Sequence, residues 1–182
     1  MFVCPSYVLD GRSITKEKRH EIFGKVAGGA GSRAPEIFQR KMIVEGTGVE
    51  CPKTHMRINL RTQTLEEVRQ PNIRTNGFDY SEDFDGCQTF GDKKVYLNLK
   101  CIADAGGNQT RSLREVYWFV EGQINLLNHG MENVYFANIL DGDEAHKHMK
   151  KFEYSLGLSG HADKVYVGDL KGYFTWLSEK MA

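Results

Sequence analysis

Apolar residues recur at spacings of three and four through residues 109–127, the clearest periodic pattern in the chain. This spacing places the apolar side chains on one face of an α-helix, because each residue turns the helix by about 100°. The segment is therefore predicted to be an amphipathic helix whose apolar face packs on a core. That face consists of Leu113, Val116, Tyr117, Val120, Ile124 and Leu127.

Three short segments rich in β-branched and aromatic residues surround this helix, at 94–101, 133–140 and 164–167. Their composition predicts β-strands. Residues 141–157 are predicted as a turn and a helix, and residues 170–181 as a closing helix. Alternation of strands and helices indicates an α/β fold with a central mixed β-sheet flanked by helices.

The N-terminal part is predicted to contribute two further helices. The first spans residues 13–26, with Ser13 as its N-cap. The second starts near Ser32, with Pro35 in its first turn. The glycines between the two helices do not form a phosphate loop, because no Gly-Lys-Ser/Thr opens a helix after a strand. A helix stop and connector is the better interpretation of Gly28, Gly29 and Gly31.

Composition indicates one soluble globular domain over residues 1–182, with 40% hydrophobic and 26% charged residues. No apolar run approaches the roughly 18 to 20 residues that cross a bilayer, so no membrane segment is expected. The N-terminal sequence lacks the basic start and apolar stretch of a signal peptide, which predicts a cytoplasmic protein. The four cysteines form no CxxC pair, so free thiols are expected rather than a zinc site.

Net charge is zero, but its distribution along the chain is uneven. Residues 1–75 hold 13 Lys and Arg against 8 Asp and Glu, whereas the remainder holds 11 against 16. A basic half beside an acidic half is compatible with a DNA-contacting part next to a metal-binding pocket, although chance also produces such a difference. Residues 51–76 are polar, Arg-rich and predicted to be a loop, with a possible strand within 57–64.

Candidate chemistry lies where an acidic turn precedes the strand 94–101. Asp85 stands in this turn, and Lys100 lies near the end of the strand. Alternation along the strand places Asn98 and Lys100 on one face, so we expect Asp85, Asn98 and Lys100 to converge at one edge of the sheet. Phosphodiester cleavage needs such groups, because Mg²⁺ binds one or two carboxylates and a lysine offsets charge on the transition state.

The turn Phe84-Asp85-Gly86, followed by Asn98-Leu99-Lys100 on a strand and by the segments GGNQTRSLREVYWF and VYFANILDGD, resembles the PD-(D/E)XK nuclease superfamily. It is most similar in pattern to the type II restriction endonucleases, over roughly residues 77–177. The resemblance implies a restriction endonuclease-like sandwich that cleaves double-stranded DNA at specific sequences with Mg²⁺. It further implies that residues 77–177 form the catalytic core, with Asp85 as a metal ligand and Lys100 as the catalytic lysine.

The sequence departs from the family pattern at Asn98, where the family has Glu or Asp. An amide keeps an oxygen but lacks the charge that holds a divalent ion. Three explanations stay open: an inactive relative that still binds nucleic acid, an inactivating substitution, or a carboxylate supplied from elsewhere. Glu115 is one candidate, although its helical phase places it opposite the apolar face. The other candidates are Gln109 at the start of the helix, Glu82 in the acidic turn, and Glu36.

DNA contacts are expected from arginines, which pair with phosphates and with guanine edges. The candidates are Arg57, Arg61, Arg69, Arg74 and Arg111, most of them in residues 1–75, the predicted helical and DNA-contacting part. A chain of this length needs a second copy to cut both strands, so a twofold homodimer is predicted. A solvated basic loop is the alternative interpretation of these arginines.

A third function is a metal phosphoesterase that uses a His/Asp cluster. Its candidate ligands are Asp141, Asp143, His146, His148 and His161. Against this hypothesis, residues two apart on a helix point in nearly opposite directions, which separates His146 from His148.

Overall fold

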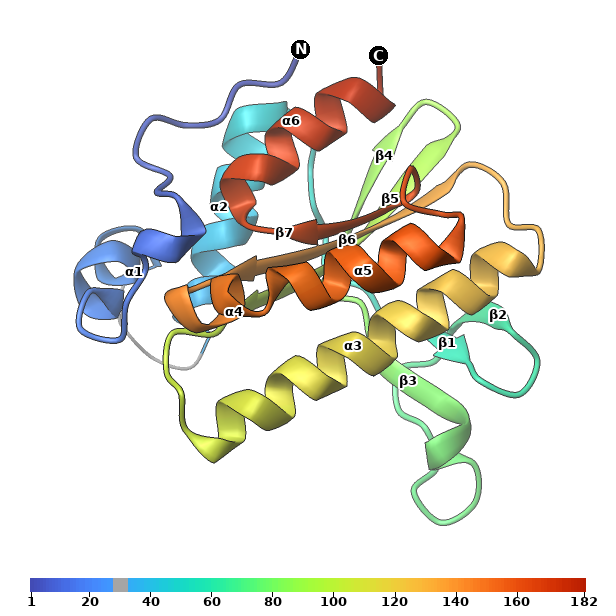
Figure 1. Cartoon of the computed structure of the whole chain (residues 1–182). Helices are drawn as coiled ribbons and strands as arrows, with labels where there is room; N and C mark the ends of the chain where they lie inside the picture. The colour runs from blue at the N-terminus through green and yellow to red at the C-terminus, as the bar shows by residue number, and fades with distance from the viewer. Residues whose placement is uncertain (28–32) are drawn as a thin grey trace.

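A four-stranded mixed sheet forms the centre of the protein, as the computed structural model shows for residues 1–27 and 33–182 (Figure 1). The strand order is β4-β5-β6-β7. The pair β4–β5 is antiparallel, whereas β5–β6 and β6–β7 are parallel. The bounds are Gly86–Phe90 for β4, Lys93–Cys101 for β5, Val134–Asp141 for β6 and Val165–Gly168 for β7. The predicted α/β fold with a mixed sheet is confirmed.

Helices in the connections cover both faces of this sheet. Helix α3 (Gly107–Asn128) joins β5 to β6, and α4 (Asp143–Lys147) with α5 (Met149–Ser159) joins β6 to β7. Helices α2 (Ala34–Thr47) and α6 (Leu170–Lys180) cover the other face. Parallel neighbouring strands need a crossover connection, and these helices supply it for β5–β6 and for β6–β7.

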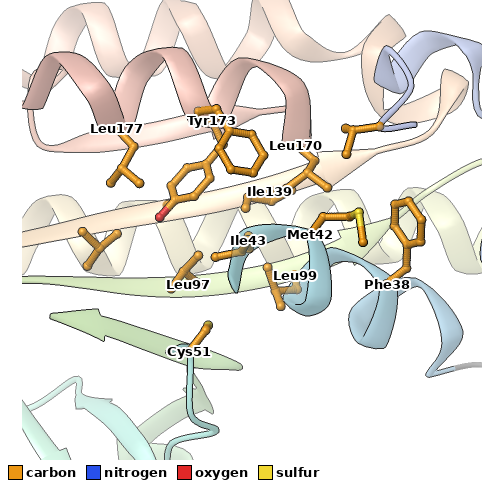
Figure 2. Close-up of a cluster of buried hydrophobic side chains, with 14 of the residues drawn as sticks. Phe38, Met42, Ile43, Cys51, Leu97, Leu99, Ile139, Leu170, Tyr173 and Leu177 are labelled. Atoms are coloured by element: carbon orange, nitrogen blue, oxygen red, sulfur yellow. The ribbon is translucent and has the colours of Figure 1, made fainter. Parts of the chain in front are cut away.

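The core on the α2–α6 side is built from one side-chain row of each strand and from the apolar faces of the two helices (Figure 2). Leu97 and Leu99 of β5 point into this layer, while Tyr96 belongs to the cluster on the α3–α5 side. The central strand β5 is therefore buried on both faces, as expected for a strand with a parallel partner and helices on either side. Figure 2 shows Phe38, Met42, Ile43, Ile139, Leu170, Tyr173 and Leu177 in the same layer.

The N-terminal segment differs from the sequence prediction. Helix α1 spans Arg19–Ala27, and Ser13 is instead the last residue of a 3₁₀ turn, η1 (Gly11–Ser13), capped by Asp10. The prediction of a helix from Ser13 was therefore wrong. The backbone around residues 11–14 accepts hydrogen bonds from the β6–α4 turn, and Ile14 is buried, so tertiary contacts hold this stretch outside the helix. Pro35 lies in the first turn of α2 as predicted, while the predicted glycine connector falls outside the described residues.

A second, smaller sheet occupies the region expected to be a loop and an acidic turn. Its order is β2-β1-β3, and both pairs are antiparallel. The bounds are Met56–Asn59 for β1, Thr64–Glu67 for β2 and Tyr80–Asp83 for β3, with a 3₁₀ turn, η2, at Gly77–Asp79. The predicted strand within 57–64 is found, but the acidic segment is not a single long turn: it consists of β3, a short turn at Phe84 and Asp85, and β4.

The small sheet packs on helix α3 through Ile58, which is fully buried in the same apolar cluster as Phe119. A Cβ atom on Gly122 would lie 3.3 Å from the Cδ1 atom of Ile58, so this glycine lets the strand approach the helix closely. None of the helices among the described residues is both long and apolar enough to cross a membrane.

Candidate active-site cleft

Asp85 lies at the junction between the two sheets. The backbone N–H of Phe84 donates to Met56 in the small sheet, at 3.0 Å, whereas the N–H of Asp85 donates to Leu97 in the central sheet, at 2.8 Å. The Asp85 side chain turns back onto β5, where its Oδ2 accepts a 2.7 Å hydrogen bond from the Leu99 N–H. Backbone and side chain together fix the position of this carboxylate.

Lys100 follows on the same strand, one residue beyond the peptide group that Asp85 contacts. Its Nζ lies 3.5 Å from Oε2 of Glu82, which β3 contributes. The structure therefore brings together Glu82 of β3, Lys100 of β5 and Asp85 from the bend between β3 and β4, as the sequence pattern predicts for Asp85 and Lys100. The alternation of β5 also places Asn98 and Lys100 on one face.

The ionisable groups of this cluster shift one another's pKa values. Burial raises the pKa of Asp85 to about 6, against the Leu99 hydrogen bond and the Lys100 charge, which lower it. The carboxylates of Glu36 and Glu82 raise this pKa further. For Lys100, burial acts to lower the pKa, but Glu82, Asp85 and Glu115 together raise it above its ordinary value. Lys100 is therefore a protonated ammonium at neutral pH, and three further carboxylates, Glu36, Glu82 and Glu115, act on Asp85 or Lys100.

Arg40 of α2 ties the Asp85 turn to the rest of the fold. Its guanidinium donates to the backbone carbonyls of Cys51, at 2.6 Å, and of Asp85. The same side chain forms an ion pair of 2.9 Å with Glu36, one turn earlier on the helix. The arginine thus positions both the turn and Glu36 beside the site, a role that the sequence pattern alone did not reveal.

Asn98 lies deeper than the other candidates, with an exposed fraction of only 1%. Its Nδ2 lies 3.4 Å from Oδ1 of Asn138, which also accepts a 3.0 Å hydrogen bond from Gln123. Gln123 in turn accepts from Asn138 at 2.8 Å. Asn98 is therefore part of a buried network of neutral amides.

Glu115 is exposed, as its helical phase predicts, yet it lies in a groove of about 380 Å³ together with Glu82. The groove runs between α3 and the small sheet, where Trp118 and Ile58 also contribute to its walls. The helical phase of Glu115 predicted its exposure but not its place in this groove, because a second side of α3, which includes Gly122, packs on β1. Gln109 is the third residue of α3, and its side chain makes no hydrogen bond to the described residues around Asp85.

The metal-binding capacity of the site is limited to a hard ion that keeps most of its water ligands. The described residues contain no group of three or more His, Cys, Asp or Glu side chains that could hold a metal ion. Mg²⁺ is commonly bound through one or two carboxylates and several waters. The fixed carboxylate of Asp85 and the nearby Glu82 match that requirement, whereas Asn98 is engaged in the amide network.

The candidate DNA-contacting arginines differ in accessibility. Arg57 is largely buried and holds the small sheet, because its guanidinium donates to Val68 at 2.9 Å and to Ser81 at 3.0 Å. Arg61 forms a 2.6 Å ion pair with Asp79 and remains 77% exposed, and the other three candidates are also exposed: Arg69, Arg74 and Arg111.

The histidine and aspartate residues considered for a phosphoesterase are not assembled into a metal site within the described part of the chain. Asp141 is buried, where its two oxygens accept hydrogen bonds from Gln39 at 2.9 Å and from the Leu170 N–H at 3.1 Å. His148 lies 3.3 Å from Glu144 at the start of α5, while His161 follows the end of α5 and lies 2.7 Å from Asn128. His146 is exposed and Asp143 partly so.

Comparison with known proteins gives no guide to the function of these residues. No family model, no curated protein and no solved structure matches this chain.

Proposed function

We propose that the protein is a Mg²⁺-dependent endonuclease that cleaves double-stranded DNA at specific sequences, in the manner of type II restriction enzymes. One observation carries the proposal: Asp85 is fixed onto β5 by the Leu99 N–H, directly beside Lys100. A buried carboxylate with a raised pKa next to a protonated lysine is a common arrangement at catalytic sites.

In the proposed reaction, Asp85 and Glu82 would hold Mg²⁺, which would polarise the scissile phosphate and activate a water molecule. Lys100 is protonated, so its ammonium acts as a charge partner for the phosphate and orients the attacking water rather than removing a proton from it. Glu115 and Glu36 add negative potential around the ion. Arg40 keeps the Asp85 turn in place through the Asp85 carbonyl.

DNA binding is proposed for the face that carries the small sheet. Residues 68–78 contain Arg69 and Arg74 and no carboxylate, and this segment leads through η2 into β3, which carries Glu82. Arg61 and Arg111 are further exposed cations for phosphate contacts. Cleavage of both strands requires two copies of the site, so we further propose that a homodimer is the active form.

A second candidate function is binding of nucleic acid without cleavage. The observation that favours it is the buried amide network around Asn98, which leaves the site without the second strand-borne acid of the nuclease family. Such a protein would show DNA affinity that falls steeply with salt, since the contacts would be mainly to phosphates.

The experiment is incubation of mixed-sequence plasmid DNA with the protein, with Mg²⁺ or with a chelator. Discrete fragments that require Mg²⁺ and disappear in Lys100→Ala would support the endonuclease. Lys94→Ala is the matched control, because Lys94 lies on the same strand but is exposed and outside the cleft. Absence of fragments, combined with salt-sensitive DNA binding, would support the second function instead.

Metal binding can be tested without cleavage. Mg²⁺ is expected to raise the thermal midpoint of the wild-type protein, because a ligand that binds only the folded state stabilises it. Asp85→Asn should abolish this rise, whereas Asp83→Asn, a neighbouring carboxylate paired with Arg57, should retain it. An equal rise in all three proteins would contradict the assignment of Asp85.

A further inference from the structure

A groove of about 610 Å³ lies between α3 and α5, on the flank of α3 away from the Glu115 groove. Helix α3 contributes Leu113, Arg114 and Tyr117. Tyr117 follows Leu113 by four residues and Arg114 by three, so the three side chains share one side of the helix. The residues that α3 offers to the small sheet, including Glu115, lie on the opposite side. The groove is therefore distinct from the proposed catalytic cleft, and its volume suits a small-molecule ligand.

The groove has a positive rim. Arg114 from α3 and both Lys150 and Lys151 from α5 line it, and no Asp or Glu is among the lining residues. None of these three cations forms an ion pair with another residue in the described ranges. The carboxylates closest to these cations in the sequence are Glu115 on α3 and Glu153 on α5, and neither lines the groove. The rim is therefore complementary to an anion.

The walls of the groove are aromatic and apolar. Tyr117 and Tyr154 stand on the two helices that form it, and Phe152 and Leu113 are buried at its base. Tyr154 is 71% exposed, so the face of its ring is accessible to a ligand in the groove. Flat rings of this kind stack on nucleobases, and adjacent cations bind the phosphate of the same ligand.

From this combination we propose that the α3–α5 groove binds a nucleoside phosphate, with Tyr117 and Tyr154 contacting the base and Arg114, Lys150 and Lys151 the phosphate. A second copy of the chain fits less well, because a twofold contact through this groove would bring the same three cations of both copies together. The proposal does not depend on the endonuclease activity, since the two grooves use opposite sides of α3.

The test is isothermal titration calorimetry of the intact protein with each of the four deoxynucleoside 5′-monophosphates. The matching deoxynucleosides and inorganic phosphate serve as separate titrants that carry only the base or only the anion. We expect saturable binding of at least one monophosphate with a Kd below about 1 mM, and markedly weaker binding of both partial ligands. Absence of saturable heat for all four monophosphates would overturn the proposal, and so would inorganic phosphate binding as tightly as the nucleotide.

Variants locate the site. Lys151→Ala and Tyr154→Ala should each weaken binding by about ten-fold or more, because a charge-assisted contact or a stacked ring is lost. Tyr154→Phe keeps the ring and should bind almost as the wild type does. Lys171→Ala, an exposed lysine on α6, is the control and should change nothing.

The outcome is distinguishable from failure of the endonuclease proposal. Lys100→Ala should bind the nucleotide normally while losing cleavage, whereas Lys151→Ala should lose nucleotide binding. Unchanged binding in both Lys151→Ala and Tyr154→Ala would show that any nucleotide bound lies elsewhere, which would overturn the assignment to this groove.

Discussion

Replacing Asp85 by Asn should make the protein more stable while it removes the proposed metal ligand. The carboxyl is largely buried, and burial raises its pKa from an ordinary 3.8 to about 6. The folded protein therefore holds a proton on Asp85 that the unfolded chain has already released between about pH 4 and pH 6. Stability contributed by this group falls as the pH rises through that window, and above it the ionised carboxylate opposes folding.

The size of the effect follows from the two pKa values. A difference from 3.8 to about 6 corresponds to about 3 kcal/mol in the free energy of unfolding at pH 8. The pKa of about 6 already includes the Lys100 charge and the Leu99 hydrogen bond, both of which lower it against the effect of burial. Asn retains an oxygen for the hydrogen bond from the Leu99 N–H. For a chain of this length the expected rise in Tm is about 6 to 12 °C.

Thermal unfolding of the wild type and of Asp85→Asn, followed by circular dichroism without metal between pH 4 and pH 8, provides the assay. The advantage of the variant should be small at pH 4 and should grow to its full value above pH 6. Asp83→Asn removes a carboxylate that is 39% exposed and paired with Arg57, so it should give no such gain. A variant that is less stable than the wild type at pH 8, or an advantage that does not change with pH, would refute the reasoning.

Three further substitutions test other parts of the structure. Asn98→Asp should lower the free energy of unfolding, measured with urea, by about 2 to 4 kcal/mol, since it places a charge in a buried amide network. It should not increase plasmid cleavage, and more efficient cleavage by this variant would contradict the reasoning. Gly142→Ala should destabilise by about 3 kcal/mol or more, because φ is +111° and the new Cβ would lie 2.1 Å from the Ile102 carbonyl oxygen; an unchanged urea midpoint would exclude this strain. Gln39→Leu should cost about 2 to 4 kcal/mol in urea unfolding at pH 8, where Asp141, whose pKa burial raises to about 7, would be ionised without its amide donor. The cost should shrink below pH 6, and a cost independent of pH would argue that packing is its source.

The sequence predicted three of the four strands of the central sheet, β5, β6 and β7, because these strands and the helices that follow them carry strong patterns. It did not predict β4, which lies in the segment expected to be an acidic turn. The helix α3 has a regular apolar face, and β5 reads as an apolar strand with Lys100 near its end. The sequence motif predicted that Asp85 and Lys100 lie close together, but it did not predict the pairing of β4 with β5 that carries Asp85 to this strand.

The small sheet was harder to predict because its strands are only four residues long and mostly half-buried. Its stability depends on a few long-range contacts such as Ile58 on α3, which no local periodicity reveals. The same contact explains why Glu115, although exposed on α3, lies in the groove that also contains Glu82. Asn98 was assigned to the correct face of β5, but its amide partners come from α3 and β6 and leave no signal in the strand itself.

The junction at Phe84 and Asp85 links the two sheets mechanically. Consecutive peptide groups are bonded to different sheets, with no linker between them to absorb relative movement. A rotation of the small sheet would therefore be transmitted as a displacement of the Asp85 carboxylate relative to Lys100. We therefore expect a ligand that displaces β1–β3 to change the alignment of Asp85 with Lys100, so that contacts made at the small sheet would influence these two groups.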